Sequence, residues 1–152
     1  MVATGISHLE MRKSFRSSAQ YILPKCSLVK IKWKNKEGKG LSKNLLTEIL
    51  TIVCSKMEQI IGSALVEVIL YGSFARGDYN DESDIDVAVI VNNDRTEIKK
   101  YHKAIVSVLS ELNLHYEVLV SVNCIPLSDF EEYKDVLPYY RNIDIEGVRI
   151  VA

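Results

Sequence analysis

The sequence predicts an α+β domain in which helices cover a small mixed β-sheet. Its 152 residues suit one ordinary domain. Hydrophobic residues make up 47% of the chain and charged residues 26%, which is typical of a globular protein. In some segments apolar residues recur at three- and four-residue steps, which is typical of helices. Other segments are short runs rich in Ile and Val, which is typical of strands. The predicted order is helix, strand, loop, strand, helix, strand, helix.

The first predicted helix follows Ser42, a suitable N-cap, and ends at Gly62. Its apolar face is marked by residues at helical spacing: Leu45, Leu46, Ile49, Leu50, Val53, Met57, Ile60 and Ile61. A strand is expected over 66–71, where Val, Ile and Leu dominate. The polar, glycine-containing stretch 72–83 then predicts a loop with room for a short helix.

The second half of the chain predicts two more strands and two more helices. A strand is expected over 84–91, and Asn92-Asn93-Asp94 then caps a helix over about 95–112. The third strand is expected over 116–122. Ser128 is expected to begin a helix that Pro138 interrupts and that resumes to about residue 144 or 146, before Gly147. The run 130–140 is interpreted as a helix packed on the sheet, with a docking face as the alternative.

Charge divides the chain into a basic segment, 1–43, and a predicted domain, 44–152. The segment holds ten of the nineteen Lys and Arg residues but two of the twenty Asp and Glu residues. One interpretation is a basic tail for an anionic partner. The other is a translation start at Leu41, because residues 36–40 can be encoded by purines alone, as a bacterial ribosome-binding site would be. A secretion signal is not expected, because a continuous apolar core is missing there. Three scattered cysteines without a CxxC pair favour a reducing, cytoplasmic location, and no run is long enough to span a membrane.

Two aspartates at the start of the second predicted strand suggest a cation site. Side chains alternate along a strand, so Asp84 and Asp86 share one face while Ile85 and Val87 share the other. Two carboxylates held close together repel unless a cation lies between them. Oxygen ligands without nearby His or Cys favour Mg²⁺ or Mn²⁺. A solvated acid pair is the alternative.

The preceding loop adds features that suit a phosphate. Gly72 and Ser73 follow a strand, so backbone N–H groups can approach an anion closely and the hydroxyl can donate. Arg76 is either a phosphate contact or an exposed arginine. A P-loop is excluded because Asp78 and Tyr79 stand where Lys and Ser or Thr are required. An anion cradle beside a cation site is what a metal–nucleoside triphosphate complex needs.

This stretch resembles the signature of the DNA polymerase beta-type nucleotidyltransferase superfamily: Gly72-Ser73, ten residues, then Asp84-Ile85-Asp86 in a strand. The resemblance covers about residues 44–152, and the small size is similar to the minimal nucleotidyltransferases. It implies the nucleotidyltransferase (polymerase beta-like palm) fold. It also implies triphosphate binding by Gly72 and Ser73 and metal ligation by the two aspartates. For the family's third carboxylate, on a later strand, Glu117 fits, with a solvated residue as the alternative.

The activity implied is transfer of a nucleoside monophosphate, with AMP from ATP expected, to an acceptor hydroxyl with release of pyrophosphate. Mg²⁺ or Mn²⁺ is the expected cofactor. Polymerase and tRNA-end-adding members carry extra domains, so nucleic acid is not an expected partner. By analogy, the acceptor is a tyrosine of a HEPN-type toxin, for which this chain would act as the antitoxin. The alternatives are a non-catalytic nucleotide-binding module and an enzyme that modifies a small molecule such as an antibiotic.

Overall fold

A computed structural model describes residues 41–151, so the predictions for 1–40 lie outside the described residues. Within this range the strands form one mixed sheet in the order β3-β2-β1-β4. Their bounds are β1 Leu65–Tyr71, β2 Ile85–Val91, β3 Val120–Pro126 and β4 Val148–Val151. β1 pairs antiparallel with β2 and β4, whereas β2 pairs parallel with β3. The predicted α+β class with a small mixed sheet is confirmed.

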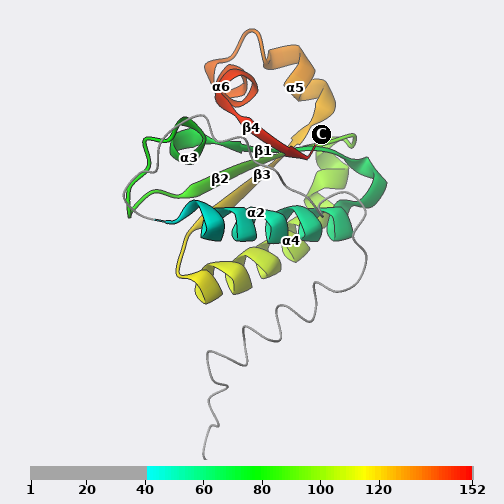
Figure 1. Cartoon of the computed structure of the whole chain (residues 1–152). Coiled ribbons are helices and arrows are strands. Elements are labelled where there is room, and N and C mark those ends of the chain that lie inside the picture. Colours follow the sequence, from blue (N-terminus) through cyan, green and yellow to red (C-terminus); the bar gives the residue numbers. More distant parts are fainter. Residues whose placement is uncertain (1–40, 152) are drawn as a thin grey trace, which may run out of the picture.

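Two long helices, α2 and α4, cover one face of this sheet (Figure 1). α2 spans Lys43–Ile61, and the hydroxyl of its N-cap Ser42 accepts the backbone N–H of Leu45 at 3.2 Å, as predicted. α4 spans Arg95–Tyr116 and is capped by the carboxylate of Asp94. The larger core lies between these helices and the sheet, and it includes Leu46, Leu50, Met57, Val87, Val89 and Leu112. Burial of these apolar side chains stabilises the helix–sheet layer.

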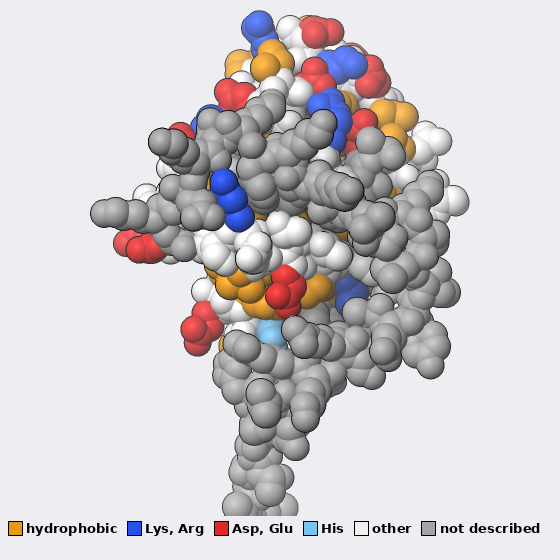
Figure 2. Space-filling model, in the orientation of Figure 1, with side chains coloured by type: hydrophobic (Ala, Val, Ile, Leu, Met, Phe, Trp, Pro, Cys, Tyr) orange, Lys and Arg blue, Asp and Glu red, His pale blue; other side chains and the backbone are white. Residues whose placement is uncertain are grey.

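The opposite face is only partly covered, by α5 (Leu127–Tyr133) and α6 (Pro138–Glu146). A smaller core forms there from Ile69, Ala88, Ile90, Ile125, Phe130 and Ile143. Arg149 of β4 pairs with Glu67 of β1 at 3.3 Å and with Asp144 of α6 at 2.7 Å, which ties the helix to the sheet. Figure 2 shows basic, acidic and apolar side chains intermixed over this α5–α6 end of the molecule.

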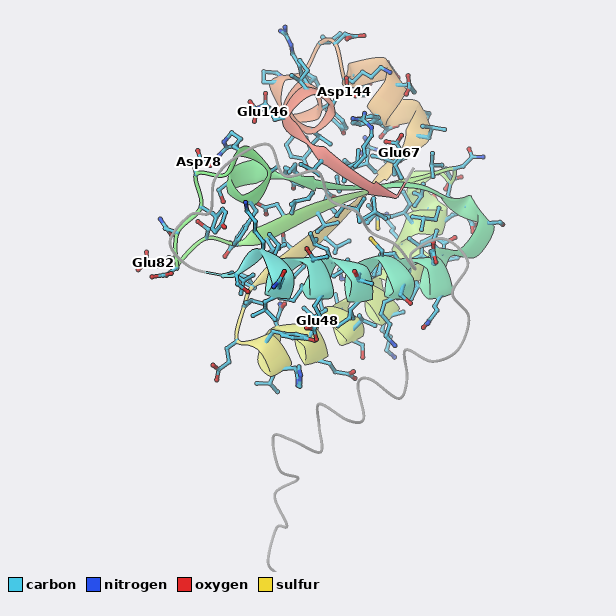
Figure 3. All side chains as sticks on the ribbon, in the orientation of Figure 1. Glu48, Glu67, Asp78, Glu82, Asp144 and Glu146 are labelled. Atoms are coloured by element: carbon cyan, nitrogen blue, oxygen red, sulfur yellow. The ribbon has the colours of Figure 1, made fainter. Side chains whose placement is uncertain are left out.

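The boundary between the second long helix and the third strand differs from the sequence-based expectation. The helix was expected to end near 112 and the strand to begin at 116, but α4 continues to Tyr116 and β3 begins at Val120. Packing extends the helix, because Leu112 is fully buried and the Tyr116 hydroxyl donates to Glu48 of α2 at 2.8 Å. Figure 3 shows Glu48 on the side of α2 that faces α4. A smaller difference is that α5 begins at Leu127 rather than at Ser128.

β3 is an edge strand of the described sheet, and one of its outer backbone positions is occupied by a side chain. The Asn113 amide accepts the N–H of Val120 at 2.9 Å and donates to the Val120 carbonyl at 3.4 Å. Asn113 thus makes the two hydrogen bonds that a neighbouring strand would make at that residue. In the described range, no helix is long and apolar enough to cross a membrane.

Candidate active site

The two predicted halves of the site meet at one end of the sheet. β1 ends at Tyr71, and a short helix, α3 (Gly72–Arg76), follows at once. β2 runs antiparallel to β1 and begins beside that end, with Tyr71 directly opposite Asp86. Gly72 and Asp86 therefore lie next to each other, with Ser73 and Asp84 near them in sequence. α6 also reaches this end, where its Glu146 pairs with Arg76, and Asp84 is exposed there.

Both oxygens of the Asp86 carboxylate have a defined neighbour. Ser121 of β3 stands opposite Asp86 in the parallel register, and its hydroxyl donates to Oδ1 at 2.7 Å. On the other side, a Cβ placed on Gly72 would lie 2.7 Å from Oδ2. Gly72 also has φ +73°, a backbone conformation that L-residues rarely adopt. The glycine is required both by its own backbone and by the approach of Asp86.

Asp84 lies one residue before β2 and is exposed. The strand therefore starts one residue later than expected, at Ile85, whose N–H donates to the Leu119 carbonyl at 2.8 Å. The intervening loop is anchored by a buried aromatic pair: the rings of Phe74 and Tyr79 stack with centroids 4.2 Å apart. This packing holds the chain between the glycine turn and the aspartates while the charged side chains remain in solvent.

Arg76 ends α3 and is already engaged in ion pairs. Its guanidinium lies 3.2 Å from Asp78 and 3.4 Å from Glu146 of α6. Figure 3 shows Asp78 on the loop beside α3 and Glu146 on α6. Both pairs are solvent-exposed, and exposed pairs contribute at most about 1 kcal/mol. A phosphate could therefore replace either partner at small cost.

The expectation that a strand carries Glu117 next to the aspartates is wrong. Glu117 caps the C-terminus of α4 with φ 53°, is exposed, and lies three residues before β3 begins. Its left-handed backbone ends the helix, so it is not in the sheet. Among the described residues, no group of three or more His, Cys, Asp and Glu side chains is placed to hold a metal ion. Asp84, Asp86 and Glu117 thus do not form one ligand group.

The sequence reasoning missed three polar side chains of β3 and α6: Ser121, Asn123 and Tyr139. The Tyr139 hydroxyl of α6 accepts a hydrogen bond from the Asn123 amide at 2.6 Å and lies 3.2 Å from the Tyr71 hydroxyl. Tyr139 therefore links β1 and β3 across β2. Burial is the main cause, and the hydrogen bond to Tyr139 the second cause, of a pKa of Tyr71 well above its usual value. Ser121 and Asn123 alternate with apolar residues. With the strand placed at 120–126, this pattern would have predicted that both side chains lie on the same face of the sheet as Asp86.

The two carboxylates suit a hard divalent cation whose remaining ligands come from a phosphorylated molecule. Mg²⁺ keeps several waters and is commonly bound by one or two carboxylates together with substrate phosphates. Asp84 and Asp86 supply two carboxylates, and Gly72 leaves room for the Asp86 carboxylate beside the turn. These residues fit such an ion when a triphosphate supplies further oxygens.

Comparisons with known proteins agree on one family. A family model described as a nucleotidyltransferase domain matches residues 46–151. Three similar proteins of Methanocaldococcus jannaschii are each named a "putative protein adenylyltransferase". The first is 38% identical over 76 residues, which is 50% of this chain and 75% of that protein. The second is 31% identical over 81 residues, covering 53% and 55%, and the third is 30% identical over 81 residues, covering 53% and 73%.

Proposed function

The chain belongs to the nucleotidyltransferase domain family and is a nucleotidyltransferase, and from this premise we propose that it transfers AMP from ATP to an acceptor hydroxyl with the help of Mg²⁺ or Mn²⁺. The observation that carries the proposal is the close approach of Gly72, at the start of the Gly72-Ser73 turn, to Asp86 of the Asp84–Asp86 pair. A turn suited to a phosphate and a carboxylate pair suited to a cation are thus adjacent, which supports the proposal.

Each residue of the site has a proposed task. Ser73 and the backbone N–H groups of the turn hold the triphosphate, and Arg76 exchanges one of its carboxylate partners for a phosphate. Asp84 and Asp86 hold the divalent cation, which supplies charge stabilisation at the reacting phosphate. Glu117 is left out of this set because of its place at the end of α4.

The proposed reaction is an in-line substitution at the α-phosphorus. The acceptor oxygen forms a bond to the α-phosphorus, the bond between that phosphorus and the bridging oxygen to the β-phosphate breaks, and pyrophosphate leaves. The proton of the acceptor hydroxyl passes to a carboxylate of the aspartate pair and from there to solvent. Because Arg76 and Asp84 are exposed, an acceptor can approach them from solvent.

For the acceptor we propose a tyrosine of a partner protein of the HEPN type. Two considerations support a protein acceptor. The relatives are named protein adenylyltransferases, and the side chains of Arg76 and Asp84 are exposed. A reducing, cytoplasmic setting is part of this proposal and is supported by the free thiol of Cys124. One observation favours the alternative, a non-catalytic nucleotide-binding module: the three expected carboxylates do not form one ligand group among the described residues.

The test is intact-mass spectrometry after incubation with Mg²⁺ and each of the four nucleoside triphosphates. The samples are the full chain alone and the full chain with the protein encoded beside it. A mass gain of one or more AMP units, lost in Asp84→Asn and Asp86→Asn but kept in Asp81→Asn, supports the proposal. Asp81 is a matched control, since it is an exposed aspartate of the same loop. Nucleotide binding with no mass gain on any acceptor supports the binding module instead.

A further inference from the structure

The strand next to the aspartates carries a hydroxyl at the position from which a third carboxylate would reach the site. Ser121 of β3 is the register partner of Asp86, and its Oγ lies 2.7 Å from Oδ1. Residues paired in register point to the same face of a sheet. A side chain at position 121 therefore reaches Asp86 directly, whereas Glu117 lies outside the strand.

Because a hydroxyl stands where a third carboxylate would reach the site, the site has fewer anionic ligands. Asp84 and Asp86 bring two negative charges, whereas the neutral Ser121 hydroxyl, which donates a hydrogen bond to Asp86, adds none. Mg²⁺ needs six oxygen ligands and gives up its waters reluctantly, so two carboxylates alone hold it weakly. A triphosphate supplies both the missing oxygens and the missing charge.

We propose that, because Ser121 takes this position, the aspartate pair binds a divalent cation as its complex with a nucleoside triphosphate rather than as the free ion. Ser121 acts as a positioning residue, because it fixes Oδ1 of Asp86 while the backbone of Gly72 borders Oδ2. The inference rests on the proposed function and adds that the cation and the nucleotide bind together.

Ser121 can be substituted without disturbing the core. Its side chain is exposed, and the neighbouring outward-facing residue, Asn123, has its own hydrogen bond to Tyr139. Three variants are informative: Ser121→Ala removes the hydroxyl, Ser121→Thr keeps it, and Ser121→Asp introduces the third carboxylate. Ser107→Ala is a matched control, since Ser107 is exposed on α4, which covers the other face of the sheet.

The experiment measures Mn²⁺ retained by the full chain in ultrafiltration, with and without a non-hydrolysable ATP analogue. We expect the analogue to raise the Mn²⁺ affinity of the unmodified chain by at least about tenfold. Ser121→Asp should raise the affinity without the analogue by about tenfold, as a third carboxylate joins the site. Ser121→Ala should lower the affinity with the analogue by about tenfold, and Ser121→Thr should restore it, as expected for an outer ligand partner.

The outcomes separate this inference from the proposed function. If the unmodified chain binds free Mn²⁺ as tightly as it does with the analogue, the inference fails while nucleotide transfer stands. If the chain retains neither Mn²⁺ nor the analogue, the proposed function fails, and the inference with it. Should circular dichroism show that Ser121→Asp does not fold, the other two variants decide: equal affinities for Ser121→Ala and Ser121→Thr contradict the positioning role.

Discussion

Substitution of Gly72 by alanine separates the backbone requirement of this glycine from its contact with Asp86. Gly72 has φ +73°, and a Cβ there would lie 2.7 Å from Asp86 Oδ2. Gly62 offers a matched control, because its φ is +66° but nothing lies within 4 Å of an added Cβ. Both alanine variants incur the backbone strain, but only in Gly72→Ala does the added Cβ also collide with the Asp86 carboxylate.

The magnitude follows from these two terms. A positive φ costs an L-residue about 1–3 kcal/mol, and the stiffer unfolded chain returns about 0.4–1 kcal/mol. Both Gly62→Ala and Gly72→Ala should thus lower the free energy of unfolding by about 0.5–2 kcal/mol. At roughly 4–8 °C per kcal/mol, each lowers Tm by several degrees. In Gly72→Ala the carboxylate of Asp86 must also shift, which strains its hydrogen bond from Ser121.

The assay pairs urea unfolding with the rate of AMP transfer at a temperature where both variants remain folded. Gly72→Ala should lose about 10–100-fold in transfer rate, the range seen when the partners of metal ligands are disturbed. Gly62→Ala should keep the rate of the unmodified chain. Equal rates in the two variants would refute the argument that Gly72 is needed for the placement of Asp86.

Three further outcomes are expected. Asp84→Asn should lower the transfer rate at least about 100-fold by removing charge from the cation site, whereas Asp81→Asn should leave it unchanged; steady-state kinetics would check both. Burial raises the pKa of the Cys124 thiol to about 11, so alkylation by iodoacetamide should be slow at neutral pH and accelerate as the pH approaches 11. Because the unfolded thiol loses its proton first, near a pKa of about 8.5, this group should also reduce stability as the pH rises from there to about 11, which urea unfolding of Cys124→Ala against the unmodified chain would reveal. Tyr139→Phe should lower the free energy of unfolding by about 1 kcal/mol, since it removes the hydroxyl shared by Asn123 and Tyr71, and no loss in chemical denaturation would contradict that bridge.

The parts of the fold that were predictable are those specified by local sequence. The first long helix could be placed to within a residue, because Ser42 caps it and its apolar stripe continues to Ile61. β1 and β2 were identifiable as runs of β-branched residues. The two halves of the site were also predictable, since the glycine turn and the aspartates are joined by one short loop and need little tertiary information to meet.

The end of α4 was not predictable, because contacts distant in sequence decide it. Residues 116–122 are mostly apolar and rich in Val, like a strand. The helix nevertheless continues to Tyr116, whose hydroxyl reaches Glu48, 68 residues earlier in the chain. Glu117 then ends the helix in a conformation that few non-glycine residues adopt. This error moved the third strand, and with it the side chain expected to complete the metal site.

The edge of β3 limits how this protein can associate with other chains through its backbone. In a parallel ladder, alternate residues direct both backbone groups away from the sheet, and on β3 these are Val120, Val122, Cys124 and Pro126. The Asn113 amide already bonds the N–H and the carbonyl of Val120, and Pro126 has no backbone N–H. Val122 and Cys124 are left to receive a foreign strand, a stretch too short for stable strand addition. The β3 edge is thereby protected against strand addition without a charged residue.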